Sequence, residues 1–134
     1  MNDRRQFIVA ATVIRDEEGH ILLVRKRGTS RFMLPGGKIE TGESPRECAI
    51  REAHEELGVA LDRALLVPLG EWTAPAANEP EHTVHGHMFT HPWVPGIEVR
   101  GEIDELLWFD PSTSRDDLAP LFEHRVLPAL RERA

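Results

Sequence analysis

One helix is specified by the sequence at both of its ends, and it divides the strand-like segments of the chain into two groups. The run Ser44-Pro45-Arg46-Glu47 combines a side-chain capping pattern with a proline at the first helical position. Gly58 is the residue type that most often ends a helix in the left-handed conformation. The sequence therefore predicts a helix that begins at residues 44–45 and continues to about Leu57, with strands packed around it.

The other segments alternate between β-branched apolar runs and turn-forming residues, a pattern that indicates strands. Residues 7–15 and 20–27 flank a polar turn and are predicted to pair as a hairpin. Residues 32–37 are predicted to lead from an apolar segment into a turn at Gly36-Gly37. Further strands are expected within residues 59–72, 83–91, 97–99 and 105–109, with a loop over 73–82.

A second helix is expected over residues 114–130, broken or kinked by Pro120 and Pro128. A helix in the middle of the chain and another at its end, with strands between them, favour a mixed sheet packed in layers against helices, hence an α/β or α+β fold. The length of 134 residues fits a single domain spanning residues 1–134.

The first helix has two separate faces when its residues are placed at about 100° each. Ala49, Ile50, Ala53 and Leu57 fall on one stripe, which we expect to be buried. Glu52, Glu55 and Glu56 share a neighbouring arc, whereas Glu47 and His54 point elsewhere, toward solvent. The helix therefore presents one apolar face and one acidic face side by side.

Three carboxylates so close together repel one another, and they also lie near the helix C-terminus, where the helix dipole disfavours anions. A divalent cation removes both penalties, and Mg²⁺ binds through a few carboxylates together with substrate phosphates. A solvated acidic surface is the alternative interpretation. The residues around the helix favour the metal site, because Gly36-Gly37 allows close backbone approach and Arg51 can orient a carboxylate.

These residues resemble the Nudix box. The box consists of Gly, five residues, Glu, seven residues, and then Arg-Glu-aliphatic-any-Glu-Glu-any-Gly-aliphatic. Gly37, Glu43 and the run from Arg51 to Val59 (REAHEELGV) match every strictly typed position, and the strand order on both sides of the box is also similar. Ala53 departs from the pattern, since the family usually has a larger aliphatic residue there. The resemblance implies a Nudix-type α/β/α sandwich, with a mixed β-sheet between helices.

The resemblance also implies roles for individual residues. Glu52, Glu55, Glu56 and the carbonyl of Gly37 would bind Mg²⁺, with Mn²⁺ as an alternative. Arg51 would orient the catalytic carboxylate and Glu43 would support the site. Some family members add a carboxylate before a late Trp, which corresponds to Glu102 here, with Glu105 as second choice. Either Glu52 or Glu102 would then be the general base.

The family hydrolyses diphosphate linkages in nucleoside diphosphate derivatives. The small size of the chain resembles that of MutT-like (deoxy)nucleoside triphosphate pyrophosphohydrolases; an ADP-ribose or nucleotide-sugar pyrophosphatase and a catalytically silent nucleotide-binding domain are the alternatives. The basic residues Arg25, Arg27 and Lys38 are candidates for binding substrate phosphates. Strand alternation places Arg25 and Arg27 on one sheet face.

The net charge of −7 argues against a surface for nucleic acid polymers, and no segment is apolar enough for a membrane span. We expect a cytoplasmic protein, with a homodimer as the assembly favoured by general frequency. Cys48, the single cysteine, is expected to be a small packed side chain without catalytic function. His85, His87 and His91 share one face of a strand, but their spacing matches no strong zinc motif, so we expect them to line a pocket or the surface.

Overall fold

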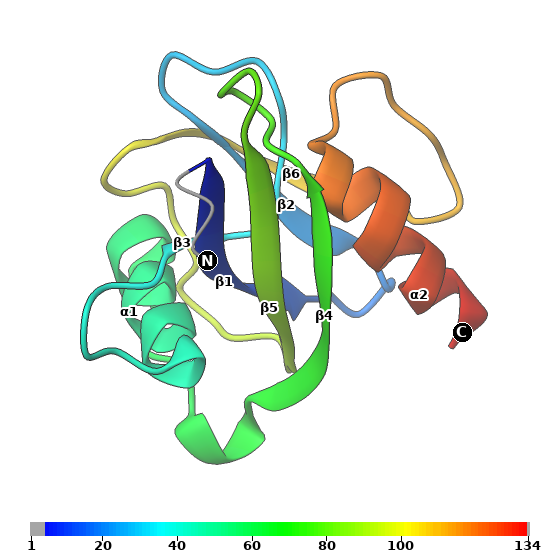
Figure 1. Cartoon of the computed structure of the whole chain (residues 1–134). Helices are drawn as coiled ribbons and strands as arrows, with labels where there is room; N and C mark the ends of the chain where they lie inside the picture. Colours follow the sequence, from blue (N-terminus) through cyan, green and yellow to red (C-terminus); the bar gives the residue numbers. More distant parts are fainter. Residues whose placement is uncertain (1–4, 134) are drawn as a thin grey trace.

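The computed structural model describes residues 5–133, in which helices cover β-structure from two sides (Figure 1). The strands are β1 (Gln6–Ile14), β2 (Ile21–Lys26), β3 (Gly36–Lys38), β4 (Val67–Pro75), β5 (Thr83–His91) and β6 (Ile103–Phe109). The helical elements are α1 (Pro45–Leu57), the 3₁₀ turn η1 (Arg63–Leu65), the π-helical turn η2 (Phe122–Val126) and α2 (Leu127–Glu132). The expected α/β/α layering with mixed strands is confirmed.

The central sheet has four strands in the order β3-β1-β5-β4. β1 and β5 run parallel, with Gln6 opposite Thr83 and Ile14 opposite His91. The β1–β3 and β4–β5 pairs are antiparallel. β2 and β6 form a separate two-stranded antiparallel sheet. The strands are thus divided between two sheets, only the larger of which is mixed.

The predicted hairpin between residues 7–15 and 20–27 is wrong. Both edges of β1 are occupied, one by β3 and the other by β5, so β2 has no edge of β1 to pair with. The polar turn does form, because the Asp16 N–H donates to the His20 carbonyl at 3.0 Å. Only one bridge, between Arg15 and Ile21, continues the pairing before the chain passes to the second sheet.

The two faces of the central sheet carry two separate cores. Ala10 and Phe89 belong to the core that packs under α1, with Leu57 at its centre. Ala11 and Met88, their strand neighbours, belong to the core on the opposite face, under the C-terminal helix. Alternation along β1 and β5 therefore sends consecutive residues to different helical layers. None of the helices in the described part of the chain has both the length and the apolar character of a membrane-spanning segment.

The helix α1 forms over the predicted residues and with the predicted ends. The Ser44 hydroxyl accepts a hydrogen bond from the Glu47 N–H at 3.1 Å, and the Glu47 carboxylate accepts one from the Ser44 N–H at 3.0 Å. Gly58 ends the helix with φ 70°. The predicted apolar stripe is buried except for Ile50, which is half-buried at its edge.

The predicted turn at Gly36-Gly37 is wrong, because both residues lie in the extended strand β3, paired with Ala11 and Ala10. Their glycine identity is explained by close packing instead of by a turn. A Cβ on Gly36 would collide with the carbonyl oxygen of Ala10, and a Cβ on Gly37 would lie 2.5 Å from a carboxylate oxygen of Glu52. The two glycines therefore let β3 lie directly against β1 and α1.

The strand predicted within residues 59–72 starts only at Val67, and β4 continues into the segment predicted as a loop. The predicted strands over 83–91 and 105–109 form, the latter with two more residues at its start. The strand predicted over 97–99 does not form. This segment lies against the end of α1, where the Glu98 N–H donates to the Leu57 carbonyl at 3.0 Å, because the last carbonyls of a helix have no partner within it.

The C-terminal helix starts at Pro120, not at Ser114 as predicted, because proline suits the first helical turn and breaks the interior. The segment before it pairs instead with Phe32, whose N–H donates to the Asp117 carbonyl at 2.8 Å. Pro128 does not break the helix. The π-helical turn η2 precedes it, with the Leu127 N–H donating to the Phe122 carbonyl.

Candidate active site

The acidic face of α1 lies beside β3, and its carboxylates differ in burial. Glu56 is buried, with 5% of its surface exposed, and its carboxylate accepts a hydrogen bond from the Gly36 N–H at 2.9 Å. Its other oxygen lies 3.7 Å from the ammonium of Lys26. Burial raises the pKa of Glu56 to about 8, and the neighbouring Glu52 acts in the same direction. A cation placed here would favour the ionised carboxylate and reverse that effect.

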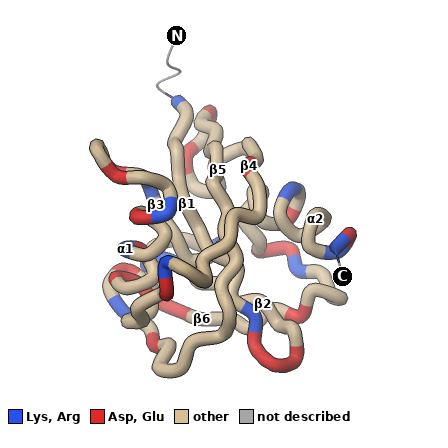
Figure 2. The backbone as a smooth tube through the Cα atoms, turned by 90° about the horizontal axis from the view of Figure 1, so that it is seen from below, with Lys and Arg blue, Asp and Glu red and all other residues tan. Residues whose placement is uncertain are grey.

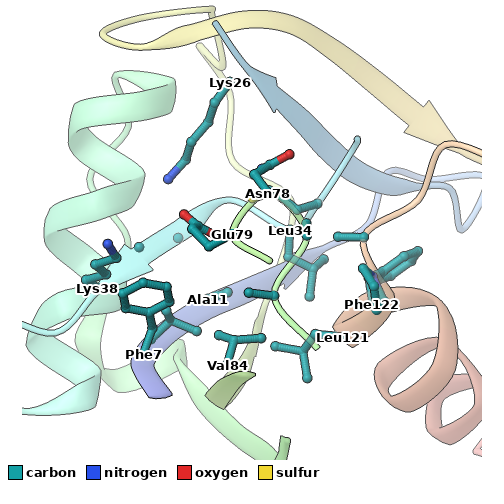
Figure 3. A pocket seen from close by; sticks show the side chains of 18 of the residues that line it. Phe7, Ala11, Lys26, Leu34, Lys38, Asn78, Glu79, Val84, Leu121 and Phe122 are labelled. Atoms are coloured by element: carbon teal, nitrogen blue, oxygen red, sulfur yellow. The ribbon is translucent and has the colours of Figure 1, made fainter. Parts of the chain in front are cut away.

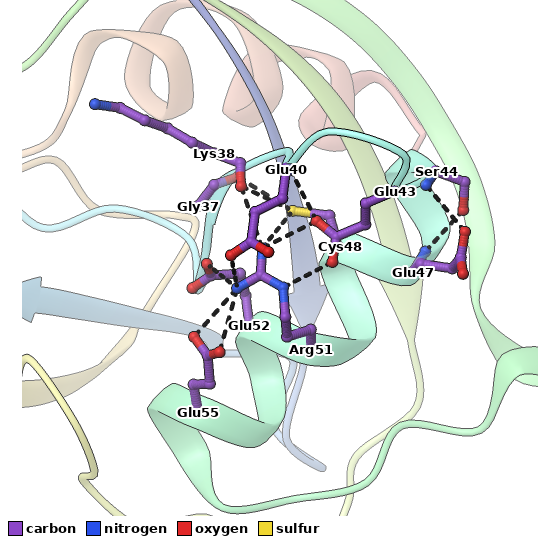
Figure 4. Close-up of polar contacts among 10 residues, drawn as sticks. All are labelled: Gly37, Lys38, Glu40, Glu43, Ser44, Glu47, Cys48, Arg51, Glu52 and Glu55. Atoms are coloured by element: carbon purple, nitrogen blue, oxygen red, sulfur yellow. Dashed lines mark hydrogen bonds and ion pairs between the residues drawn. The ribbon is translucent and has the colours of Figure 1, made fainter.

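Arg51 is the hub of the hydrogen-bond network beside Glu52 (Figure 4). Its guanidinium forms a two-pronged contact with Glu43, with N–O distances of 2.7 and 3.0 Å. It also donates to Glu52 at 2.9 Å and to Glu55 at 3.2 Å. The contact with Arg51 lowers the pKa of Glu43 to about 2. Arg51 therefore keeps Glu43 ionised and holds Glu52 against the strand β3.

The carbonyl of Gly37 lies close to the same group of side chains. The Cys48 thiol donates to it at 3.4 Å, and both carboxylate oxygens of Glu52 lie within 2.9 Å of where a Gly37 side chain would begin. The structure thus brings together Gly37, Glu43 and the four residues singled out on the helix (Arg51, Glu52, Glu55 and Glu56). The spacing of these residues in the sequence did not predict that the helix residues would lie against strand β3.

The possible ligand atoms of this site fit a hard divalent cation. The carboxylates outnumber the cationic groups of Arg51 and Lys26, and one carboxylate, that of Glu56, is buried. In this structure the carboxylates of α1 do not converge on one point. Within residues 5–133, the one group of three or more acidic, imidazole or thiol donors that lie within 4.8 Å of one another is elsewhere, on β4 and β5. Arg51 donates to one oxygen of Glu52 but to both oxygens of Glu55, so Glu55 must turn from Arg51 to bind a metal jointly with Glu52 and Glu56.

A cavity of about 250 Å³ opens next to this acidic site (Figure 3). Its walls are mostly apolar and come from β1, β5 and the start of the C-terminal helix, including Val84, Leu121 and Phe122. Gly37, Lys26 and Lys38 line it as well and connect it to the carboxylates of α1. The two ammonium groups lie on the α1 side of the cavity, where Phe7 lies beside Lys38, and the apolar Leu121 and Phe122 lie on the side of the C-terminal helix. The arrangement suits a ligand with one apolar and one anionic end.

The basic residues expected to bind phosphate are placed differently from one another. Lys38 lines the cavity, with its ammonium 3.9 Å from the centre of the Phe7 ring. Arg25 is engaged by Asp104 at 2.8 Å and Glu105 at 3.1 Å and does not line the cavity. Arg27 is exposed and donates to the Gly101 carbonyl at 3.2 Å.

The sequence analysis selected Arg25 and Arg27 from the basic end of β2 and passed over Lys26, which is the residue of β2 that reaches the acidic site. The signal was present in the alternation of the strand, because Lys26 must face opposite to Arg25 and Arg27. The cavity walls were missed too. They come from segments such as 7–11, 75–79 and 119–122, which are far apart in the chain and share no motif.

Glu102, the expected additional carboxylate, is exposed in the turn before β6. Its carbonyl accepts a hydrogen bond from the Arg27 N–H at 2.7 Å. The preceding residue, Gly101, packs against the end of α1, so that a Cβ on it would lie 3.1 Å from the Glu55 carbonyl oxygen. The turn therefore lies beside the acidic face. Cys48 is fully buried, and burial raises the pKa of its thiol to about 12, which suits a packed and unreactive side chain.

Several of the curated proteins that resemble this chain are named as 8-oxo-dGTP diphosphatases. A putative 8-oxo-dGTP diphosphatase of Bacillus subtilis is 34% identical over 79 residues, which cover 59% of this chain and 52% of that protein. The CTP pyrophosphohydrolase of Escherichia coli is 32% identical over 109 residues, covering 78% of this chain and 75% of that protein. The chain spans about half the length of the first curated relatives it matches.

Solved structures share the fold. The crystal structure of a MutT protein from Methanosarcina mazei superposes with a TM-score of 0.81 over 99% of both chains, at 24% sequence identity. The model of the family described as NUDIX domain matches residues 5–130, nearly all of the chain that the structure describes. With the box residues assembled between α1 and β3, this match shows that the chain belongs to the NUDIX domain family.

Proposed function

We propose that the protein is a magnesium-dependent hydrolase that cleaves the diphosphate linkage of a nucleoside diphosphate derivative, with a (deoxy)nucleoside triphosphate as the favoured substrate. The observation that carries this proposal is the contact between an apolar cavity and the acidic face of α1, with two lysines at the boundary. The 8-oxo-dGTP diphosphatase and CTP pyrophosphohydrolase relatives support a triphosphate substrate.

Some residues of the site would bind the substrate, and others would take part in the hydrolysis. The apolar walls would bind the nucleoside, and the ammonium groups of Lys26 and Lys38 would bind phosphate oxygens. Glu52, Glu55, Glu56 and the Gly37 carbonyl would hold the cation. When bound there, Mg²⁺ would supply positive charge that neutralises the phosphates and would lower the pKa of the attacking water. Arg51 positions Glu52 through the 2.9 Å hydrogen bond, and Glu52 or Glu102 accepts the proton from the attacking water.

Two alternatives remain testable against this proposal. ADP-ribose or a nucleotide sugar would use the same phosphate site, but would need room for a second sugar beyond it. A catalytically silent nucleotide-binding domain would need neither the buried Glu56 nor the Arg51 network. The burial of Glu56 beside a weak partner, at 3.7 Å from Lys26, argues against the silent domain, since a buried carboxylate without function is costly.

The test is a panel of nucleoside triphosphates, ADP-ribose, nucleotide sugars and dinucleoside polyphosphates, assayed with Mg²⁺ and then with Mn²⁺. Release of a nucleoside monophosphate together with pyrophosphate supports the triphosphate proposal. Release of a nucleoside monophosphate and a sugar phosphate supports the first alternative. Absence of turnover on the whole panel, with measurable nucleotide binding, supports the silent domain and overturns the proposal.

Substitutions on the acidic face of α1 test which residues are needed for hydrolysis. Glu52→Gln and Glu56→Gln should each abolish turnover while the thermal unfolding transition stays cooperative. Glu17→Gln is the matched control, because Glu17 is an exposed carboxylate in the turn after β1, and it should keep full activity. Normal rates in either α1 variant would contradict the assignment of the site.

A further inference from the structure

A second group of donor atoms lies on the central sheet, on the face opposite to the substrate cavity. His85 and His87 alternate along β5 with Val84 and Met88, which line the cavity. The two imidazoles therefore point away from the cavity. The third member, Glu71, lies on the neighbouring strand β4, directly opposite His87 in the strand register. The group is thus held by two hydrogen-bonded strands.

The donor atoms of these residues converge. One oxygen of Glu71 lies 3.0 Å from Nε2 of His85 and 3.5 Å from Nδ1 of His87. All three ligand atoms lie within 4.8 Å of one another. Donors around a tetrahedral zinc ion with bonds of about 2.1 Å are separated by about 3.4 Å, so only small side-chain rotations are needed. The α1 carboxylates show no such convergence.

The surroundings of the group also suit a metal site. Thr73, opposite His85 in the register, places its hydroxyl 2.8 Å from Nδ1 of His85. A hydroxyl can accept the Nδ1 proton when Nε2 binds a metal, and such a second contact fixes the ring of a metal-binding histidine. An open hollow of about 400 Å³, lined by Glu71 and His87, leaves room for water to complete the coordination.

His91, which shares the same strand face, is not part of the group. Its Nε2 accepts a hydrogen bond from the Asp62 N–H at 2.9 Å, and its Nδ1 lies 2.8 Å from the Pro92 carbonyl. Its Nε2 therefore holds the loop after α1, its Nδ1 contacts the next residue of its own segment, and both ring nitrogens have partners. Of the three histidines on this strand face, His91 therefore has a structural role, whereas His85 and His87 converge. The third donor of the group, a carboxylate, comes from the neighbouring strand β4.

We propose that Glu71, His85 and His87 form a binding site for a zinc-like transition-metal ion that links β4 to β5, independent of the magnesium site of the hydrolase. Two imidazoles and one carboxylate favour Zn²⁺ over Mg²⁺, which prefers oxygen donors. Because β4 is an edge strand, an ion held by both strands stabilises the pairing at the rim of the sheet. Ion binding to the folded state alone raises its stability with ion concentration.

The test measures the affinity for Zn²⁺ by competition with a chromophoric chelator, in excess Mg²⁺ so that the α1 carboxylates are occupied. One equivalent should bind, and His85→Gln, His87→Gln and Glu71→Gln should each weaken binding at least about tenfold. His124→Gln is the matched control, an exposed histidine paired with Glu123 on the C-terminal helix, and should leave the affinity unchanged. Glu56→Gln should also leave it unchanged, which separates this site from the hydrolase site.

A second measurement does not depend on variants. Zn²⁺ should raise the melting temperature of the wild-type protein, and Co²⁺ should give the visible absorption of an ion bound by nitrogen and oxygen donors. No zinc binding in excess Mg²⁺ would overturn the proposal, as would full affinity in both histidine variants. Nucleotide hydrolysis by His85→Gln in zinc-free buffer should equal that of the wild type, so failure of this proposal leaves the proposed hydrolase untouched.

Discussion

Substitution of Gly37 by alanine should lower the rate of catalysis about 100-fold and leave the fold intact. The added Cβ would lie 2.5 Å from one carboxylate oxygen of Glu52 and 2.9 Å from the other. Ordinary van der Waals contact begins near 3.4 Å, so the carboxylate must move by roughly 1 Å. The atoms in the way belong to the end of a flexible side chain, and the backbone of Gly37 needs no left-handed conformation.

A displacement of about 1 Å in a catalytic group costs about 100-fold in rate, or about 2.7 kcal/mol in the activation free energy. The free energy of unfolding should change by less than about 1 kcal/mol, because the loss of chain entropy in the unfolded state partly offsets the side-chain shift. The assay is kcat/KM on the best substrate of the nucleotide panel, together with thermal unfolding of the same preparation.

Gly36→Ala is the matched comparison, one residue earlier in the same strand. Its Cβ would collide with the carbonyl oxygen of Ala10 and with Ala11 on β1, and neither can move without separating the strands. This variant should lose about 1–3 kcal/mol of stability or more, as overpacked cores do. A rate of Gly37→Ala within threefold of the wild type, or equal losses of stability in the two variants, would contradict this prediction.

Three further predictions concern the groups around Glu52. Arg51→Lys should lower metal affinity about 10- to 100-fold, measured by Mg²⁺ titration of activity, because lysine cannot replace the two-pronged contact with Glu43. Cys48 should resist thiol reagents in the native protein and react in denaturant, because burial raises its pKa to about 12. In chelator, the pKa of Glu56 near 8 means that the folded state binds more protons than the unfolded state between about pH 4.5 and 8. Stability should therefore fall as pH rises through that window, and Glu56→Gln should flatten the melting temperature against pH.

The sequence predicted the parts of the site that lie within one helix or next to it. The ends of α1 follow from local chemistry, and the arc of Glu52, Glu55 and Glu56 follows from helix periodicity. The position of Gly36-Gly37 in a strand could not be predicted locally, because the reason for glycine there is packing against Ala10 and Glu52. The sequence shows that glycine stands at these positions, but only the tertiary contacts show which neighbouring atoms leave no room for a side chain.

Strand partners were the least predictable feature. Residues 7–15 and 20–27 are close in sequence and joined by a polar turn, which favours a hairpin. β1 instead takes a partner on each edge, β3 and β5, and its pairing with β5 connects residues nearly 80 positions apart, such as Gln6 and Thr83. The second half of β1 is buried, so a central position in the sheet suits this strand best. The residues of the turn that follows β1 do not indicate this position.

The charge distribution explains how an acidic chain can bind an anionic substrate. Figure 2 shows basic positions interleaved with acidic ones beside α1 and β3. Arg25 is neutralised by Asp104 and Glu105 on the far side of β2, whereas Lys26, the next residue, faces the cavity. Strand alternation therefore decides which of the two cations faces the cavity. Lys26→Ala should raise KM for the nucleotide more than it lowers kcat, and Arg25→Ala should leave both unchanged; equal effects of the two substitutions on KM would contradict this assignment.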